Sequence, residues 1–486
     1  MSENIIQENI KPVCVDLDGT LIASDTLLES IILSLKINPL YIFLFPFWIL
    51  KGRLYFKNKI GQIAIPKAES LPYRQEVLKY INEEKSKGAK IILVTASVQK
   101  IADAVGLHLG IFDEVYGSTN NLNLRSNNKS QFLVDKFGKK GFIYVGDSKP
   151  DLKVWESAFE AVVVEPSKSL LTKVNNINKN ISTIQNSEFR IQNFKLIIKE
   201  IRVYQWIKNI LIFIPLLLAH RLHEYNLFLN VSLAFLSFSF TSSAVYILND
   251  MLDLEADRIH PRKKFRPFAS GNLSLINGII LFPLLLATGL SISFLWLPKD
   301  YLLILLLYLF LTTSYSFLLK KIAIFDIIIL ACLYTIRLIA GAKAVDVVIS
   351  PWLLGFSIFL FLSLALIKRY QELLTMQQNN KTQSKGRGYF IDDLTLVLNL
   401  GTSSGYLSVL VLALYVNSKE VTSLYHHPEL LWFAVICHLY WISRMWLIAH
   451  RGKMEDDPII FTAKDYVSYI IGLIIVILAL GASLWV

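Results

Sequence analysis

Residues 249–271 read NDMLDLEADRIHPRKKFRPFASG and directly follow an apolar segment long enough to cross a bilayer. Asn249, Asp253 and Asp257 are spaced four apart, so on one helix they share a face, with Asp250 beside them. Carboxylates stacked in this way repel each other unless a cation lies between them. The stretch therefore predicts a metal site at a membrane surface.

Oxygen ligands of this kind suit Mg²⁺, which keeps several waters and bridges to substrate phosphates. The basic run that follows would neutralise phosphate charge, and its members are His260, Arg262, Lys263, Lys264 and Arg266. The alternative is a solvated loop of mixed charge that obeys the positive-inside bias of membrane proteins. Oxygen side chains in helical register favour the metal site.

The composition divides the chain into two parts. Its 486 residues are 53% hydrophobic, with a formal charge of +11 and a mean hydropathy of +0.47. This is too apolar for an ordinary soluble protein and too charged for a chain that lies wholly in a membrane. We expect a soluble domain at 1–167 with a small cap at about 30–75, a linker and interfacial helix at 168–201, and a membrane domain at 202–486.

Apolar runs of bilayer length recur after Trp206 and predict nine membrane spans. Most loop lysines and arginines fall on the side that carries residues 249–271, so this side and the N-terminal domain are expected in the cytoplasm. The protein is then an integral inner-membrane protein, and no nucleic-acid motif accompanies its positive charge. The spans are expected at about 207–219, 228–248, 275–297, 301–319, 323–343, 352–367, 399–417, 430–449 and 465–485.

The soluble part opens on VCVDLDGTLIASDTL, residues 13–27, an apolar run that ends in two aspartates. A strand that stops there exposes Asp16 and Asp18 at its carboxyl end, where open α/β sheets place their chemistry. One carboxylate would attack a phosphoryl group and the other would shuttle a proton.

Three further segments end apolar runs: KIILVTAS, a lysine-bearing stretch, and FIYVGDSKPD. With the first motif they resemble the haloacid dehalogenase-like (HAD) phosphatases over residues 13–164, which implies an α/β, Rossmann-type fold. The resemblance implies Asp16 as nucleophile and metal ligand and Asp18 as acid/base. It further implies Thr95 and Lys129 as phosphate ligands and Asp147 and Asp151 as holders of Mg²⁺. Lys136, Lys139 and Lys140 are alternatives to Lys129, and a decayed domain that serves only as an anchor is the alternative to an active one.

Between the first two motifs lies an apolar, aromatic segment, residues 34–57, which Pro39 and Pro46 interrupt. The prolines argue against a straight spanning helix. Such a cap either dips Phe45, Phe47 and Trp48 into the lipid interface or forms an ordinary cap core.

From about residue 202 onward the chain resembles the UbiA superfamily of polyprenyl-handling transferases. The carrying motif is NDxxDxxxD, with Asn249, Asp250, Asp253 and Asp257 as metal ligands, and the resemblance implies an all-α membrane fold. The decaprenyl-phosphate phosphoribosyltransferase branch is the more specific likeness. Its supporting phrases are QWIKN (205–209), HPRKKFRPFASG (260–271), YSFLLKK (315–321), IRLIAGA (336–342), IKRYQEL (367–373), GRGY (386–389) and RGKMEDDPIIF (451–461).

The chain departs from relatives that consume a prenyl diphosphate, because their second aspartate-rich motif is replaced by Lys368, Arg369, Tyr370 and Glu372. We call the row of Asn249, Asp250, Asp253 and Asp257 the acidic ladder. Basic side chains opposite a single acidic ladder suit one Mg²⁺-bound pyrophosphate and a second anionic substrate. We therefore expect phosphoribosyl transfer from phosphoribosyl pyrophosphate to a polyprenyl phosphate. The candidate phosphate ligands are Lys208, Arg262, Lys263, Arg266, Lys320, Arg337, Lys368, Arg369 and Arg444, of which Lys320 and Arg444 equally suit cytoplasmic helix ends.

Transfer of this group leaves a 5-phosphate on the lipid-linked sugar, and a phosphatase in the same chain would remove it. The sequence thus predicts a bifunctional membrane enzyme. Its alternatives are an aromatic prenyltransferase with a prenyl diphosphate donor, and a non-catalytic scaffold that binds lipid.

Overall fold

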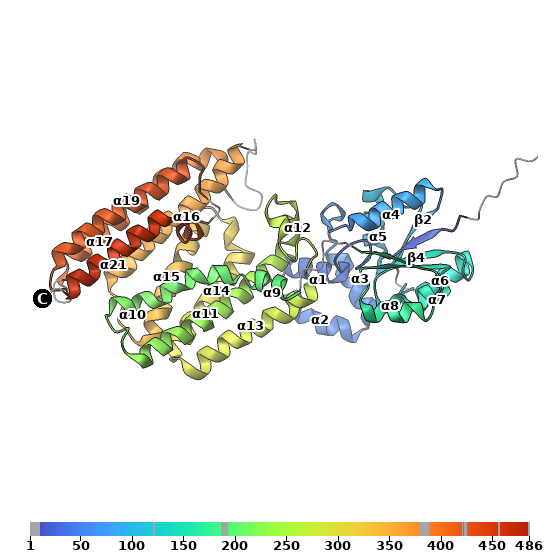
Figure 1. Ribbon diagram of the computed structural model, residues 1–486, viewed down its shortest axis with the longest axis horizontal. Helices are drawn as coiled ribbons and strands as arrows, with labels where there is room; N and C mark the ends of the chain where they lie inside the picture. Colours follow the sequence, from blue (N-terminus) through green and yellow to red (C-terminus); the bar gives the residue numbers. More distant parts are fainter. Residues whose placement is uncertain are drawn as a thin grey trace, which may run out of the picture. The chain divides into compact units, whose positions relative to one another are not determined.

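The computed structural model describes residues 10–119, 122–185, 193–378, 388–419, 421, 425–454 and 457–484 (Figure 1). The chain forms two compact units. The first comprises residues 1–201 and 246–281, and the second comprises residues 202–245 and 282–486.

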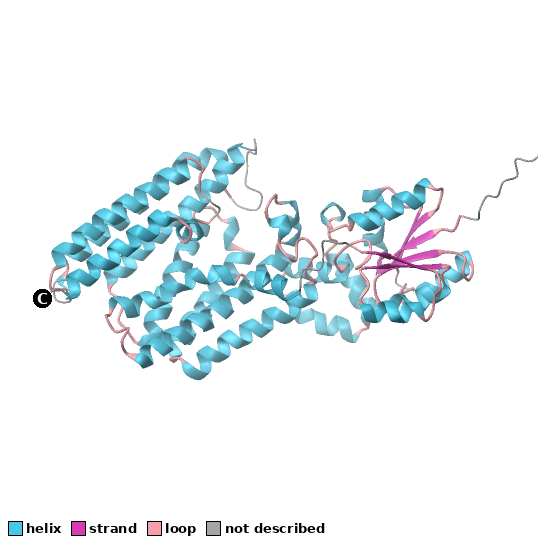
Figure 2. Cartoon of the chain, in the orientation of Figure 1, coloured by secondary structure: helices cyan, strands magenta, loops and turns pink. Residues whose placement is uncertain are grey.

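A parallel sheet of six strands organises the first unit, and Figure 2 shows these strands gathered together. The strand order β3-β2-β1-β4-β5-β6 is that of a Rossmann-like, doubly wound fold. The strands are β1 (Val13–Val15), β2 (Ile91–Val98), β3 (Glu114–Ser118), β4 (Ile143–Gly146), β5 (Glu160–Val164) and β6 (Ile181–Ile184). The helices between them are α1 (Thr26–Ile37), α2 (Tyr41–Leu50), α3 (Arg53–Ile63), α4 (Gln75–Ser86), α5 (Gln99–Leu109), α6 (Asn127–Phe137), α7 (Leu152–Ser157) and α8 (Lys168–Asn175).

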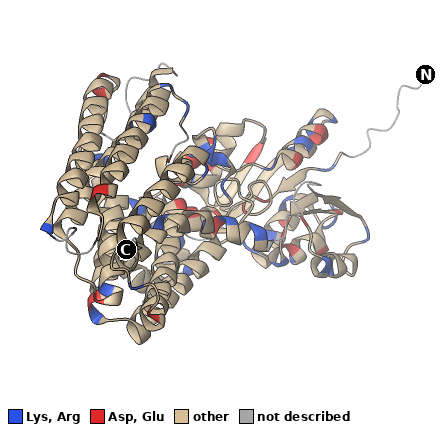
Figure 3. Cartoon of the chain, turned by 60° about the vertical axis from the view of Figure 1, so that its left-hand side comes forward, with Lys and Arg blue, Asp and Glu red and all other residues tan. Residues whose placement is uncertain are grey.

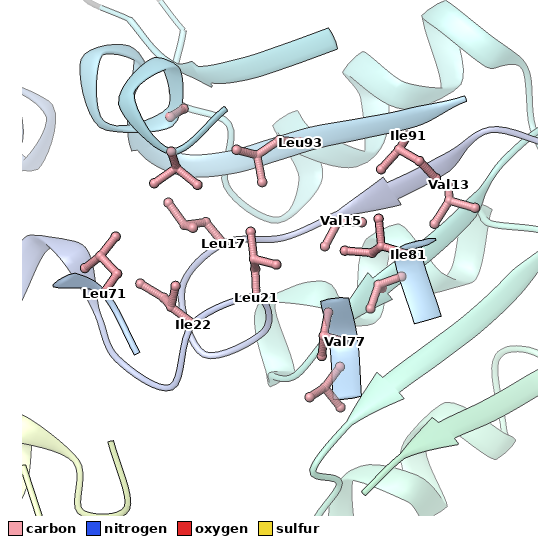
Figure 4. Close-up of a cluster of buried hydrophobic side chains, with 14 of the residues drawn as sticks. Val13, Val15, Leu17, Leu21, Ile22, Leu71, Val77, Ile81, Ile91 and Leu93 are labelled. Atoms are coloured by element: carbon pink, nitrogen blue, oxygen red, sulfur yellow. The ribbon is translucent and has the colours of Figure 1, made fainter. Parts of the chain in front are cut away.

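Helices cover both faces of this sheet, and neighbouring residues of one strand point to opposite faces. Val13 and Val15 pack in one cluster with residues of α4 and α5 (Figure 4). Cys14, between them, packs in a second cluster with residues of α6, α7 and α8. The central strand β1 is thereby fully enclosed, and the residues that follow it are held at the sheet edge.

The sheet extends into the stretch predicted as a linker. Helix α8 covers one sheet face, and β6 pairs with β5 in parallel. The prediction for 168–201 was wrong in this part, because β6 (ISTI) is short, half-exposed and set among polar residues. The expected interfacial helix begins at Asn193 as α9 (Asn193–Ile201).

The predicted cap is helical, and α2 is its most apolar part. No side chain of α2 is buried, and Phe43 and Leu50 are 70% and 84% exposed. Pro46 lies inside this ten-residue helix. Phe43, Phe47 and Leu50 of α2 face outward, whereas Phe45 packs edge-on against the buried Phe56 of α3.

Residues 246–281 belong to the first unit although they follow the first part of the second. They contain the end of α11 (Tyr225–Leu252), α12 (Leu254–Ile259), a 3-10 turn η4 (Lys263–Phe265) and the start of α13 (Leu275–Trp296). Arg258 forms a two-pronged ion pair with Glu29 of α1, at 2.7 and 2.9 Å. Both side chains are at least 94% buried, so the pair fixes α12 against α1.

Nine helices among the described residues have the length and apolarity to cross a membrane, as predicted. They are 194–218, 225–252, 275–296, 299–317, 325–345, 351–378, 391–416, 428–450 and 466–483. Few Lys, Arg, Asp or Glu colour these long helices in Figure 3. The first differs from a regular span, because an eleven-residue 3-10 segment, η3 (Val203–Phe213), precedes the short α10 (Ile214–Leu218).

Gly341 of α15 (Phe325–Val345) allows that helix to approach η3 closely. A Cβ at this position would lie 2.0 Å from the carbonyl oxygen of Ile212. Small residues permit this kind of close backbone packing between membrane helices.

We expect Gly341→Ala to lower the free energy of unfolding by about 1–3 kcal/mol, because the methyl group must displace backbone. Thermal unfolding of the detergent-solubilised protein measures this. Gly355→Ala in α16 (Pro351–Gln378) is the matched control, since its Cβ would lie 3.6 Å from Val411, an ordinary contact. Equal stability of the two variants would contradict the prediction.

Candidate functional site

The carboxyl end of β1 carries Asp16 and Asp18, both of which line one cavity. Asp16 Oδ1 accepts a hydrogen bond from Leu17 N at 2.8 Å. Asp18 accepts hydrogen bonds from Thr26 N at 2.7 Å and from Ser97 Oγ at 2.5 Å. The loop after the strand thus holds each carboxylate in one orientation.

Asp147 follows β4, the strand beside β1, and the adjacent strands bring it to Asp16. Carboxylate oxygens of Asp16, Asp147 and Asp151 lie within 4.8 Å of one another. Gly19, at φ +76°, makes room for Asp147, because a Cβ there would lie 2.3 Å from Asp147 Oδ2. The Gly of the DxDGT motif is therefore required sterically.

These carboxyl groups hold their protons more tightly than free aspartates. Burial, reinforced by Asp151 and Asp18, raises the pKa of Asp16 to about 7. Burial and Asp151 likewise raise the pKa of Asp147 to about 7, and burial and Asp25 raise that of Asp18 to about 6. Three oxygen donors under mutual repulsion are a ligand set that fits Mg²⁺.

Lys129 of α6 completes the cluster. Its Nζ lies 2.9 Å from Asp16 Oδ1, 3.9 Å from Asp151 Oδ1 and 2.9 Å from the hydroxyl of Tyr144. Burial acts to lower the pKa of Lys129, but Asp16 and Asp151 outweigh it and raise the pKa, so the lysine remains charged. The other candidates point elsewhere, since Lys136 pairs with Glu114 and Lys140 donates to the carbonyl of Ala158.

Thr95 does not line the cavity, whereas Ser97, two residues later on β2, does. Thr95 is fully buried and its hydroxyl accepts a hydrogen bond from Ser97 N at 3.1 Å. Ser97 is thus a residue that sequence reasoning missed, although the period-2 alternation of a strand gives both residues the same face. Its closeness to Asp18 came only from the fold.

The acidic ladder of residues 249–257 is interrupted at Asp253, between α11 and α12. Arg266 lies 2.8 Å from Asp250 and 2.5 Å from Asp257, so it bridges two carboxylates. Asp253 instead pairs with Lys36 of α1 at 3.3 Å. The predicted single face therefore divides into two: Asp250 and Asp257 converge, and Asp253 turns to another partner.

The charge of this ladder is partly offset in the structure. Burial raises the pKa of Asp257, Arg266 opposes this, and Asp250 adds to it. Asn249 is half-buried, Arg262 is exposed and Lys263 is half-buried. Asp250 and Asp257 converge on Arg266, so positive charge is required between them. A divalent metal ion would meet the same requirement.

In the second unit, three of the sequence segments that carry the family resemblance are in contact. Lys208, from QWIKN, contacts Asp457, from RGKMEDDPIIF, at 2.5 Å. Asn209 accepts a hydrogen bond at 2.9 Å from Arg337, of the IRLIAGA run. Burial acts to raise the pKa of Asp457, but Lys208 and Lys368 outweigh it and lower the pKa to about 2.

Arg337 is 4% exposed and lies on the faces of three aromatic rings. It donates hydrogen bonds to Asn209 and to the carbonyl of Leu333. The sequence analysis did not select Asp457 or Asn209 as site residues. Both lie inside segments that carry the family resemblance, QWIKN and RGKMEDDPIIF, and this position could have indicated them. Lys208, Lys368 and Arg337 are basic side chains that come together around Asn209 and Asp457, and basic groups of this kind are the ones that bind phosphate.

Two predicted phosphate ligands are held in ion pairs. Arg369 is 1% exposed and contacts Asp326 and Glu372, and Tyr389 also donates to Asp326 at 2.6 Å. The prediction that Arg369 binds substrate is corrected here, because a fully enclosed guanidinium joins helices instead.

Arg444 lies 2.7 and 3.0 Å from the two oxygens of Asp465, which compensates its charge between two helices. Lys320 and Lys368 are half-buried and remain candidate phosphate ligands. Part of GRGY, at 386 and 387, lies outside the described residues.

The model of the UbiA prenyltransferase family matches residues 210–464, which is more than half of the chain. An uncharacterized protein of Sinorhizobium fredii, y4nM, is 38% identical over 96% of this chain and 89% of its own length. The decaprenyl-phosphate phosphoribosyltransferase of Mycolicibacterium smegmatis is 39% identical over 181 residues, which are 36% of this chain and 57% of that protein.

A solved UbiA homolog from Archaeoglobus fulgidus, bound to GPP and Mg²⁺, covers 58% of this chain and 99% of its own, at 14% identity and a TM-score of 0.44. The family match and the nine candidate spans make this an integral membrane protein. The chain belongs to the UbiA prenyltransferase family.

Proposed function

We propose that this chain transfers 5-phosphoribose from phosphoribosyl pyrophosphate to a polyprenyl phosphate and then removes the 5-phosphate in its N-terminal domain. The observation that carries the proposal is the buried set of Asp16, Asp18, Lys129 and Asp147, built for phosphate esters, in one chain with a UbiA domain. The similarity of that domain to decaprenyl-phosphate phosphoribosyltransferases supplies the donor and acceptor classes.

For the transfer step, Asp250 and Asp257 would hold Mg²⁺, with Asn249 as a further oxygen ligand. Asp253 would join them only by leaving Lys36. When bound there, Mg²⁺ would stabilise the charge of the departing pyrophosphate. Arg266 then moves from the two carboxylates to the phosphates, where its planar group binds two oxygens at once. Arg262 and Lys263, beside it in sequence, contribute further positive charge.

The buried cationic cluster of the second unit supports the choice of a phosphate acceptor. Lys208 contacts Asp457, Lys368 lowers the pKa of the same carboxylate, and Arg337 donates to Asn209, the neighbour of Lys208, so three cationic side chains gather where we place the phosphate of the acceptor. Arg369 takes no part in this cluster, because it is paired with Asp326.

For the hydrolytic step, Asp16 attacks the phosphorus, and the bond from phosphorus to the sugar 5-oxygen breaks. Asp18 gives that oxygen its proton, and its raised pKa of about 6 increases the fraction that carries a proton beforehand. Asp18 next takes a proton from the water that cleaves the aspartyl phosphate, which regenerates Asp16 and releases phosphate. Lys129 stabilises the negative charge that builds on the phosphoryl group.

The exposed apolar helix α2 supports a lipid-linked substrate for this step. Its outward-facing Phe43, Phe47 and Leu50 suit the interface of a bilayer, and Lys51 and Arg53 follow at once. We propose that this domain and the acidic ladder lie at the cytoplasmic surface, which the bias of loop lysines and arginines favours.

The transferase proposal is tested with purified full-length protein, polyprenyl phosphate, labelled phosphoribosyl pyrophosphate and Mg²⁺. We expect labelled lipid from the wild type and a loss of about 100-fold or more in Asp250→Asn, since metal stabilisation of the leaving group contributes several kcal/mol. Chelation of Mg²⁺ should abolish the reaction in both.

Asp300→Asn is the matched control, because Asp300 is exposed and pairs with Lys343. Activity with a prenyl diphosphate and an aromatic acceptor, and none with phosphoribosyl pyrophosphate, would instead establish the prenyltransferase alternative. Retained function in Asp250→Asn would favour a non-catalytic scaffold.

The hydrolytic proposal is tested by the final product of the same reaction. We expect Asp16→Asn to accumulate lipid-linked phosphoribose 5-phosphate, because the nucleophile is gone while the transferase is intact. Wild type and the control Asp103→Asn, an exposed position on α5, should yield lipid-linked phosphoribose without the 5-phosphate. Chromatography of the labelled lipids separates the two products, and identical products from all three proteins would refute sequential processing.

A further inference from the structure

The cavity that contains the catalytic carboxylates extends well beyond them. Its volume is about 700 Å³, within the range of sites for whole small molecules. One part is lined by Asp16, Asp18 and Asp147, and another by Phe268 and residues 271–277, which belong to the 268–277 segment that follows the acidic ladder in sequence. The cavity thus has room for the body of a substrate as well as for its phosphate.

Two residues that line this cavity each carry a buried polar atom that has no hydrogen-bond partner among the described residues. The atoms are Ser30 Oγ, on α1, and Asn272 Oδ1, on the 268–277 segment. Ser30 is 1% exposed. Ser34, one turn further along the same helix, is also buried, but its hydroxyl donates to the carbonyl of Ile31 at 2.7 Å. A buried polar atom left unpaired is costly, so a ligand that satisfies it gains affinity.

The 268–277 segment is held in place by contacts within the first unit. Gly271, at φ +76°, lies so close to Ala23 that a Cβ would be 2.7 Å from the carbonyl oxygen of Ala23. Arg258, bound to Glu29, also donates to the carbonyl of Ala269 at 3.1 Å. Asn272 is therefore presented to the cavity by a fixed loop.

We infer that Ser30 and Asn272 bind the hydroxyl groups of a sugar phosphate monoester. The 268–277 segment then forms the side of the hydrolytic site that selects the substrate. The inference rests on the proposed hydrolytic function and names its substrate class. Ser30 Oγ can donate or accept, and Asn272 Oδ1 requires a donor. Sugar hydroxyls supply both, whereas the aryl group of p-nitrophenyl phosphate has no donor and only the weakly accepting nitro oxygens.

The test uses the full-length protein with Mg²⁺ and two soluble probes, ribose 5-phosphate and p-nitrophenyl phosphate. We expect Ser30→Ala and Asn272→Ala each to lower kcat/KM for ribose 5-phosphate by about 3- to 10-fold, as the loss of one hydrogen bond does. The change should fall mainly on KM. Hydrolysis of p-nitrophenyl phosphate should be unchanged, because its aryl group makes no such bonds.

Ser34→Ala is the matched control and should leave both probes unaffected. Because Ser30 and Asn272 have no partner to lose, their variants should unfold at wild-type temperature or above, which separates recognition from a structural role. In the inactive Asp16→Asn background, calorimetry should show the same weakening of ribose 5-phosphate binding.

Unaltered discrimination between the two probes in both variants would overturn this inference alone. A wild-type protein that hydrolyses neither probe nor the lipid product would overturn the hydrolytic function itself, and the inference with it.

Discussion

The ion pair between Glu29 and Arg258 joins parts of the chain that are 229 residues apart, and the hydrolytic cavity depends on it. Both charges are buried, so neither is stable without the other, and removal of one partner from such a pair typically costs about 3–5 kcal/mol. The bidentate geometry also fixes orientation, because a guanidinium and a carboxylate match in only a few ways. Residues 268–277 follow from this anchor and take their place beside the aspartates.

The same constraint, that a buried charge needs a partner, recurs throughout the protein. Lys129 stabilises Asp16, Lys208 pairs with Asp457, and Arg369 pairs with Asp326. In the first two cases the charge lies where chemistry is proposed, and in the third it joins helices that belong to separate sequence phrases. A basic residue in a family motif is thus as readily a structural element as a substrate ligand.

Much of the fold could be predicted because the relevant signals are local. Apolar runs of bilayer length led to nine spans, and the strand that ends in Asp16 and Asp18 was placed from its own pattern. The sixth strand was missed because ISTI is short and polar, and its stability comes from pairing with β5. The 3-10 geometry of residues 203–213 was also missed, and this segment lies in close contact with α15 at Gly341, a contact between residues far apart in sequence.

The sequence by itself determined the class of chemistry: paired aspartates for phosphate esters, an acidic ladder with a basic run, and helices that must lie in lipid. These follow from residue types and spacing, which the chain carries however it folds. Only the tertiary structure decided that Lys129 is the lysine beside Asp16, that Arg266 bridges Asp250 and Asp257, and that Ser30 and Asn272 share one cavity. The reason is physical: burial and electrostatic partnership depend on distances in space, and residues far apart in sequence acquire those distances only when the chain folds.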